Sequence, residues 1–284
     1  MSQRARKTDK SPKTLVSKAT ASIEEICDAA KGRVLKTIQE HYDRHKTSPW
    51  TGRQLVNLEK TLSKVYADWG KDIKEEFRES LPEVMQTFYD DAKKAMATDG
   101  RYKAIIGTPD KDLVKRFLES AFEQVAMRTD KMQHEHISIL RRIAAAVFRD
   151  TSLTGDTRRE VSKRMLEKAL SISGFEFIDR SGKTWRWESY FEMLARTELM
   201  NAGRETYDKE CAEDGYDVMV LSYSGNPCPK CKRYEGKMFS LSGATPGMPS
   251  KDDLIANGVF HPNCTHSYSA VPLSRLPKEL AEEE

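Results

Sequence analysis

The chain has 284 residues, of which 32% are charged and 38% are hydrophobic, and its formal net charge at pH 7 is +3. A mean hydropathy of −0.68 is low for a compact enzyme, so the composition favours long, solvent-exposed helices in one large or two modest domains. The nearly balanced charge gives no reason to expect a protein that coats nucleic acid or membranes. Five cysteines, an odd number, argue against a disulfide framework.

The two ends of the chain carry opposite charge. Residues 1–20 hold one carboxylate among six cations, which are Arg4, Arg6, Lys7, Lys10, Lys13 and Lys18, whereas the last three residues are glutamates. We interpret residues 1–20 as a basic flexible tail and residues 274–284 as an acidic tail. The start lacks the apolar stretch of a secretory signal, and the longest apolar run, 143–148, is too short to span a bilayer. A soluble protein without a membrane partner is expected.

Residues 21–172 are predicted to form a helical domain. Apolar side chains recur every three or four positions, most clearly between Leu55 and Trp69, so one face of that helix is expected to be buried. Pro82 predicts the start of a further helix, because proline is tolerated in a first helical turn.

Two capping signals follow in the same domain. Thr108 before a proline predicts the N-cap of a helix that reaches Phe148. Thr157 and Glu160 have the spacing of a capping box, and Gly174 is expected to end the helix that they begin. The histidine pairs 41/45 and 134/136 lie in these helices and are expected at the surface, while Cys27 and Cys211 are expected in the core.

Residues 173–273 change character and predict a small β-containing module, which makes the whole chain α+β. Apolar and polar residues alternate on both sides of 179–182, as in a β-hairpin. A helix is predicted from 188 to 214, ended by Gly215. Short strands are then expected at 217–223, 237–240 and 265–271, with a short helix at 250–256.

Two segments of this module share the form ligand-Pro-x-Cys, namely Cys228–Cys231 and His261–Cys264. Two ligands separated by two residues can both point inward from one tight turn, and the proline presets the backbone of that turn. Thiolate and imidazole ligands in a closed tetrahedral set favour zinc over magnesium or calcium. The sequence therefore predicts a structural zinc ion held by Cys228, Cys231, His261 and Cys264.

The fourth ligand stays open at this point. His266 lies two residues beyond Cys264, and alternate residues of a strand share one face, so His266 is an alternative to His261. Five ligands would exceed what structural zinc takes. A redox Cys-x-x-Cys motif is disfavoured, because such motifs open a helix, whereas Gly236 soon breaks any helix here. The proline at the second position of both segments also argues against the interpretation that these cysteines are ordinary buried core residues.

Two other functional classes compete with a structural role. A zinc-dependent nuclease or hydrolase would need an open position on the metal and a nearby acid or base, and Glu235 is the carboxylate close in sequence. A nucleic-acid-binding protein would use exposed cations. The candidates for such contacts are Arg4, Arg6, Lys7, Lys10, Lys13, Lys230, Lys232 and Arg233.

Several ordered segments resemble one protein family, the phage minor capsid protein 2 family, which is similar in turn to the Mu F-like head morphogenesis proteins. The segments are Tyr190–Glu198, Asp217–Leu221, Asn226–Cys231, Tyr234–Gly243 and His261–His266. The likeness covers roughly residues 150–272, so it identifies 173–273 as a Mu F-like or minor capsid zinc module, whereas residues 1–150 resemble no family.

The resemblance implies a minor structural protein of a tailed-phage head, without catalytic turnover. It implies several copies at the portal vertex or inner capsid, in contact with the portal protein or the major capsid protein and with packaged double-stranded DNA. Such a protein would assist head morphogenesis and DNA packaging or delivery. It would be found in the virion and, during assembly, in the host cytoplasm.

Overall fold

The computed structural model describes residues 11–45, 52–98, 107–154, 157–171, 175–179 and 181–276. The chain divides into two compact units. Unit 1 contains Met1–Thr20, Phe77–Glu119 and Met193–Glu284, and unit 2 contains Ala21–Glu76 and Ser120–Glu192. None of the helices in the described part of the chain is both long enough and apolar enough to cross a membrane.

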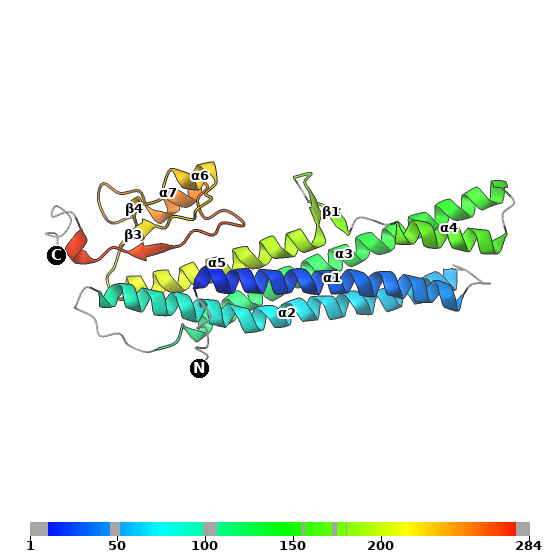
Figure 1. The fold of residues 1–284 in the computed structure, drawn as a ribbon, viewed down its shortest axis with the longest axis horizontal. Coiled ribbons are helices and arrows are strands. Elements are labelled where there is room, and N and C mark those ends of the chain that lie inside the picture. The colour runs from blue at the N-terminus through cyan, green and yellow to red at the C-terminus, as the bar shows by residue number, and fades with distance from the viewer. Residues whose placement is uncertain are drawn as a thin grey trace, which may run out of the picture. The chain divides into compact units, whose positions relative to one another are not determined.

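Long helices make up most of the described chain, as the sequence predicts (Figure 1). In order they are α1 (Pro12–Arg44), α2 (Gly52–Ala97), α3 (Lys111–Thr154), α4 (Arg158–Leu170) and α5 (Trp187–Glu213). The helices α1, α2, α3 and α5 each contribute residues to both units. Because α1 begins at Pro12, the second half of the predicted basic tail is helical.

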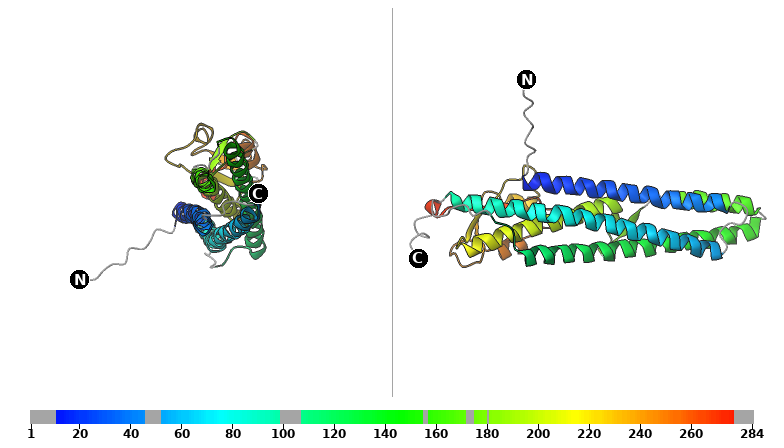
Figure 2. Two further views of the ribbon diagram at one scale, coloured as in Figure 1. Left: turned by 90° about the vertical axis from the view of Figure 1, so that its right-hand side faces the viewer. Right: turned by 90° about the horizontal axis from the view of Figure 1, so that it is seen from below.

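In unit 2, α1, α2 and α3 run alongside one another (Figure 2). Their buried faces follow helical spacing, as on α2, where Leu58, Leu62, Trp69 and Ile73 are at most 1% exposed. Outside the buried faces, charged side chains join neighbouring helices. Arg33 of α1 pairs with Asp72 of α2 at 2.9 Å. The apolar period predicted between Leu55 and Trp69 is thereby confirmed.

An aromatic cluster forms the centre of unit 2. Trp69 of α2 and Trp187 at the start of α5 stack with their ring centroids 4.9 Å apart, and Phe175 meets Trp187 edge-on at 4.6 Å. His136 of α3 is buried among these rings, and its Nδ1 lies 2.6 Å from the hydroxyl of Tyr66. The prediction that His136 is solvated is wrong, because it continues the buried stripe of Met132 and Leu140 at four-residue spacing.

Three local predictions on the helices need correction. Pro82 lies inside α2 and does not begin a helix, because the buried stripe continues through Leu81 and Val84 and holds the helix together across the proline. The cap of α3 is Asp110, whose carboxylate accepts hydrogen bonds from two backbone N–H groups, and not Thr108. His41 is 7% exposed and packs against His45, so it is not a surface residue.

Other predictions on this part of the chain are confirmed. Thr157 and Glu160 form the capping box of α4. The hairpin consists of β1 (Glu176–Ile178) and β2 (Thr184–Arg186), which pair antiparallel. Cys27 and Cys211 are fully buried. Gly174 lies outside the described residues; the described part of α4 ends with Ser171 as its C-cap.

The C-terminal part of unit 1 is built on a three-stranded antiparallel sheet in the order β4-β3-β5. The strands are β3 (Val218–Leu221), β4 (Met238–Ser240) and β5 (Tyr268–Ala270), and two short helices, α6 (Pro229–Lys232) and α7 (Lys251–Ala256), lie in the connections. A 3₁₀ turn follows at Leu273–Arg275. We call residues 216–276 the C-terminal module; it contains each of the short elements predicted after residue 215.

The C-terminal half of α5 supports this module. The Tyr207 hydroxyl accepts a hydrogen bond of 2.9 Å from the backbone N–H of Ala270, and the Tyr268 hydroxyl donates to Asp208 at 2.5 Å. Gly203 allows α2 to approach α5 closely, because a Cβ at that position would lie 2.2 Å from the Phe88 ring. The module is therefore anchored on a helix whose own position is fixed within unit 1.

Candidate metal centre

Two tight turns bring the predicted ligands together. In the first, Cys228 is the N-cap of α6, and its Sγ accepts from the backbone N–H of Cys231 at 3.5 Å. In the second, the backbone N–H of Cys264 donates to the carbonyl of His261 at 3.0 Å. The second turn needs a left-handed residue, and Asn263 supplies it with φ of 69°. Each turn thus presents two side chains on one side, as the spacing predicts.

The ligand atoms form two triads that share Cys231. One consists of Cys228, Cys231 and His261, the other of Cys231, Cys264 and His266, and within each triad all ligand atoms lie within 4.8 Å of one another. Across the two turns, Cys228 Sγ lies 3.2 Å from His261 Nε2, and Cys231 Sγ lies 4.0 Å from Cys264 Sγ. The structure therefore gathers all five candidate ligands of the sequence, including both histidines, around Cys231.

The electrostatics of this cluster suit a cation. Cys231 is buried, and its burial together with the neighbouring sulfurs of Cys264 and Cys228 raises the pKa of its thiol to about 12. The pKa of Cys228 is lowered to about 7, first by the hydrogen bond from the Cys231 backbone. Several thiolates packed this closely would repel one another, and a bound zinc ion would remove that cost, because it displaces the thiol protons and neutralises the resulting thiolates. The donor set of sulfur and imidazole nitrogen fits zinc.

The two histidines are supported differently. His266 is 3% exposed, its Nδ1 lies 3.4 Å from Cys264 Sγ, and its Nε2 lies 2.9 Å from Glu235. A carboxylate behind a ligating histidine is the usual arrangement that fixes the ring at a metal. The Nδ1 of His261 lies 2.7 Å from the carbonyl of Pro262, which fixes its ring as well. Geometry thus allows either histidine as the fourth ligand.

Glu235 and Arg204 are functional residues whose roles the sequence did not reveal. Glu235 accepts hydrogen bonds from the backbone and hydroxyl of Ser224, and the backbone bond is the main reason why its pKa is lowered. Arg204 is 4% exposed and donates to the carbonyls of Cys264 and His266 at 2.8–2.9 Å. Burial lowers the pKa of this guanidinium. Nothing in the spacing of α5 predicts the role of Arg204, because the two carbonyls that it binds lie 60 or more residues away in the sequence.

The segment 196–198 of α5 packs against the second turn. Arg196 donates to the side-chain oxygen of Asn263 at 2.7 Å, and the backbone N–H of Asn263 donates to the hydroxyl of Thr197 at 3.0 Å. The left-handed residue of the turn is therefore held by α5 from two sides. This contact explains why a polar helix segment accompanies the metal motif in the sequence.

The structure describes four of the eight predicted nucleic-acid contacts. Lys230, Lys232 and Arg233 are exposed together in and just after α6. Lys13 is exposed on α1, and Arg4, Arg6, Lys7 and Lys10 lie outside the described residues. Three of the four described candidates therefore lie in or next to the first turn.

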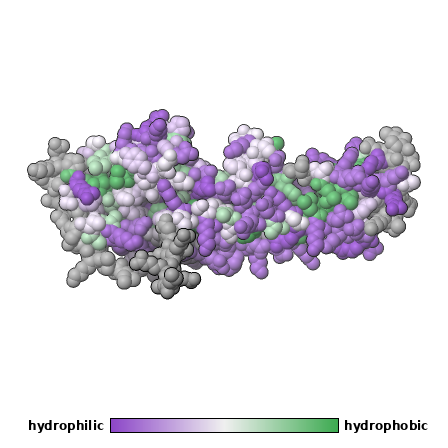
Figure 3. Space-filling view, viewed as in Figure 1, coloured by the Kyte–Doolittle hydropathy of each residue, from purple (hydrophilic) through white to green (hydrophobic). Residues whose placement is uncertain are grey.

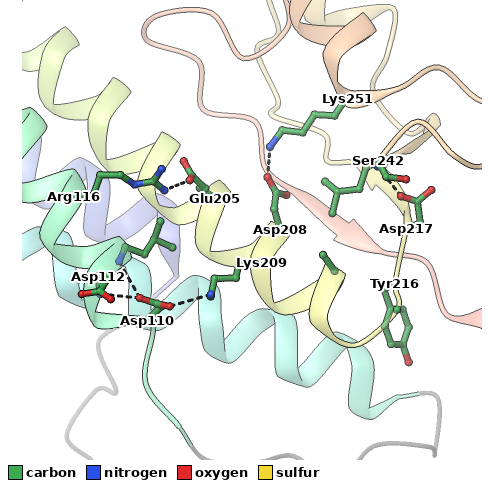
Figure 4. Close-up of a pocket in the computed structure, with 14 residues that line it drawn as sticks. Asp110, Asp112, Arg116, Glu205, Asp208, Lys209, Tyr216, Asp217, Ser242 and Lys251 are labelled. Carbon is green, nitrogen blue, oxygen red and sulfur yellow. Dashed lines mark hydrogen bonds and ion pairs between the residues drawn. The ribbon is translucent and has the colours of Figure 1, made fainter.

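A pocket of about 870 Å³ lies elsewhere in unit 1, lined by α3, α5, the start of β3 and α7 (Figure 4). Its charged rim is paired internally: Arg116 with Glu205, Lys209 with Asp110, and Lys251 with Asp208. Asp217 accepts from the Ser240 hydroxyl and from the Ser242 backbone at 2.5–2.7 Å. These carboxylates join α3 to α5 and the module to α5, and the metal centre is the better-supported site.

Comparison with known proteins identifies a family for nearly the whole chain. The family model for phage minor capsid protein 2 matches residues 11–277. No curated protein and no solved structure matches the chain in the corresponding comparisons. The match includes residues 11–150, for which the sequence motifs indicated no family. One family model therefore covers both the long helices and the C-terminal module. The chain is a member of the phage minor capsid protein 2 family.

Proposed function

We propose that this minor capsid protein is a zinc-stabilised structural part of the phage head that attaches at the portal vertex or the inner capsid surface. Family membership supports a place in the virion among other head components. The observation that carries the zinc assignment is the convergence of two distant turns, so that two further sulfurs and two imidazoles surround Cys231. A closed set of this kind supplies folding free energy to a small module.

A structural role fits the site better than catalysis. Catalytic zinc keeps an open position and a free acid or base beside it. Here five candidate ligands are available for four positions, and Glu235, the carboxylate next to the cluster, is already engaged by Ser224 and His266. We infer that the ion is enclosed by protein ligands and that the chain turns over no substrate.

The proposed partners are the portal protein or the major capsid protein, with several copies of this chain around the portal. Assembly would begin in the host cytoplasm, and the chain would then assist head morphogenesis and the packaging or delivery of double-stranded DNA. Localisation tests this proposal: the chain should be resolved at the portal vertex or inner shell in a reconstruction of procapsids or virions. Density confined to the outer surface or to the tail would contradict it.

Metal analysis tests the zinc assignment. The purified chain should contain one zinc ion, and Cys264→Ser should release it, because this residue supplies a sulfur that joins the two turns. Cys27→Ala is the matched control, since Cys27 is an equally buried thiol of unit 2. Full zinc content in Cys264→Ser would contradict the proposed ligand set.

Two further variants decide the fourth ligand. We propose His261, because it completes the second turn opposite Cys228. His261→Ala should therefore release zinc. His266→Ala should keep the ion with affinity about 10- to 100-fold lower, as expected for a group that supports a ligand. The reverse pattern would assign the fourth position to His266, with Glu235 orienting it.

A further inference from the structure

A single loop of the C-terminal module concentrates exposed cations. We define the knuckle loop as residues 222–237; it contains α6 and is closed at its base by hydrogen bonds from the backbone N–H of Leu221 to the Lys237 carbonyl and from that of Gly236 to the Leu221 carbonyl, 3.1 and 2.9 Å long. Hydrophilic side chains gather over α6 and α7 on the face seen in Figure 3. The metal turn therefore forms one end of a compact hairpin loop.

The charge of the knuckle loop is one-sided. Its cations, all exposed, are Lys230, Lys232, Arg233 and Lys237. The single carboxylate between residues 218 and 250 is Glu235, and it points inward to Ser224 and His266. Among carboxylates in the described part of the chain, none lies within salt-bridge distance of these four cations. The loop therefore presents positive charge that the rest of the described chain does not neutralise.

An exposed aromatic ring lies among these cations. Tyr223 is 73% exposed, the largest exposure among the large hydrophobic side chains of the described chain. Its hydroxyl lies against the backbone of Gly236, because a Cβ at Gly236 would be 2.2 Å from the Tyr223 oxygen. Gly236, with φ of 72°, thus gives room for the ring beside Lys237. Burial does not explain this ring, since most of its surface is open to solvent.

Lys230 packs against the segment that follows α7. Its Cδ lies 2.7 Å from the position that a Cβ on Gly258 would occupy, so the aliphatic stem packs on the Gly258 backbone while the residue stays exposed. A side chain that is already ordered loses less entropy when it binds a ligand. The cation nearest the metal turns is therefore prepared for contact with an anion.

We propose that the knuckle loop binds single-stranded nucleic acid. The four cations would contact successive phosphates, and Tyr223 would stack on one unpaired base. Exposed cations combined with an open aromatic face are the features by which single strands are bound without sequence preference. A base within a duplex is already stacked on both sides and cannot use the ring, so a single strand fits this surface better than a duplex. The proposal does not depend on attachment to the portal.

Fluorescence anisotropy with the full-length, zinc-loaded chain tests the proposal. The probe is a labelled single-stranded 20-mer of deoxythymidine, compared with a duplex of the same length. The single strand should bind more tightly, and log K should fall with log salt with a slope of about −3, as expected for four phosphate contacts. Equal or tighter binding of the duplex would overturn the proposal.

Variants separate the ring from the charge. Tyr223→Ala should weaken binding of the single strand about fivefold to 100-fold, whereas Tyr223→Phe should bind like the parent. The triple variant Lys232→Glu, Arg233→Glu, Lys237→Glu should abolish binding. Its matched control is Lys60→Glu, Lys64→Glu, Lys71→Glu, which changes three exposed cations of α2 by the same charge and should keep most of the affinity.

Three outcomes would overturn the proposal: an unchanged affinity in Tyr223→Ala, an equal effect of the two triple variants, or equal competition by poly-glutamate or by anionic phospholipid vesicles at matched charge. The last result would assign the loop to acidic protein or lipid surfaces. Zinc content and thermal unfolding of each variant should match the parent, so that a loss of binding is not a loss of fold. Tyr223 and the cations are exposed, and their replacement should not disturb the core.

Discussion

Unit 2 and the C-terminal module reach a stable structure by different means. In unit 2, long helices bury apolar stripes, and on α1 the residues Ile23, Cys27, Ala30 and Ile38 are all fully buried. The module has strands of three or four residues, and its interior includes buried polar groups such as Arg204 on α5 and His266. A sheet with strands this short needs further packing or cross-links for stability. The comparison indicates that apolar burial specifies unit 2, whereas buried hydrogen bonds and the proposed metal ligands specify the module.

Removal of the metal should have the largest effect and should sharpen this comparison. Cys231→Ala deletes the sulfur shared by both triads, so the module should unfold, with a loss on the scale of structural zinc binding, about 10 kcal/mol. Hydrogen exchange should show lost protection in β3 and β5 and retained protection in α1 and in the Gly52–Glu76 part of α2. Simultaneous unfolding of both regions would break the comparison, because the helices would then depend on the metal as well.

Truncation of Lys93 should have the next largest effect. This side chain of α2 is 12% exposed and pairs with Glu210 at 2.8 Å and with Asp214 at 2.9 Å, both on or next to α5. Lys93→Ala leaves two carboxylates largely buried without their cation, which should cost about 3–5 kcal/mol in the free energy of unfolding.

A double replacement provides the control for Lys93. Glu210→Gln combined with Lys93→Met removes the charge of Lys93 and of one of its two partners. The double variant should therefore lose less free energy of unfolding than Lys93→Ala alone. Urea unfolding followed by circular dichroism measures both variants. A Lys93→Ala loss below 1 kcal/mol would mean that the network is solvated and does not position α5.

Much of the fold follows from local sequence signals. The hydrophobic period of α2, the capping box at Thr157 and the left-handed Gly215 (φ of 78°) lie where the sequence predicts them. Errors arise where tertiary packing competes with a local signal. Pro82 is such a case, since a proline that would begin an isolated helix is carried inside a packed one. His136 is another, because a polar residue is expected at the surface, whereas its position in the helix places it on a buried stripe.

The candidate metal centre was predictable in its ligands but not in its surroundings. The repeated ligand-Pro-x-Cys form identifies Cys228 and Cys264, since a tight turn is a local property. Glu235 behind His266 and Arg204 beneath both turns could not be assigned, because these contacts depend on how α5 and β5 meet. Both histidines reach the cluster, so the choice between them depends on side-chain positions and not on spacing.

The stability of unit 2 should fall in acid. Burial lowers the pKa of His136 from 6.5 to about 4, so the unfolded chain binds the proton more readily than the folded one. The neutral ring therefore contributes full stability above pH 6.5, and this contribution is lost as the pH falls toward 4, by about 3 kcal/mol. His41, whose pKa burial also lowers to about 4, acts in the same direction.

A non-titrating variant isolates the contribution of His136. His136→Gln should reduce the slope of unfolding free energy against pH between 6.5 and 4 by about one proton, with the remainder due to His41 and the carboxylates. Thermal unfolding monitored by tryptophan fluorescence reports on this region, because Trp69 and Trp187 lie in the same cluster. An unchanged slope would show that His136 is accessible to protons in the folded state.

The smallest effect is expected at the surface of unit 2, where neither apolar burial nor a ligand is involved. Thr157 and Glu160 satisfy each other's backbone N–H groups at the start of α4, and both side chains are exposed. Thr157→Ala removes the cap and should lower the free energy of unfolding by about 1 kcal/mol, while Thr157→Ser should be nearly neutral. The lost free energy should be confined to fraying of α4, because long helices packed along an apolar stripe do not depend on a single cap. Hydrogen exchange across α4 measures this, and a loss of protection that spread into α1 or α2 would show that unit 2 unfolds through its surface.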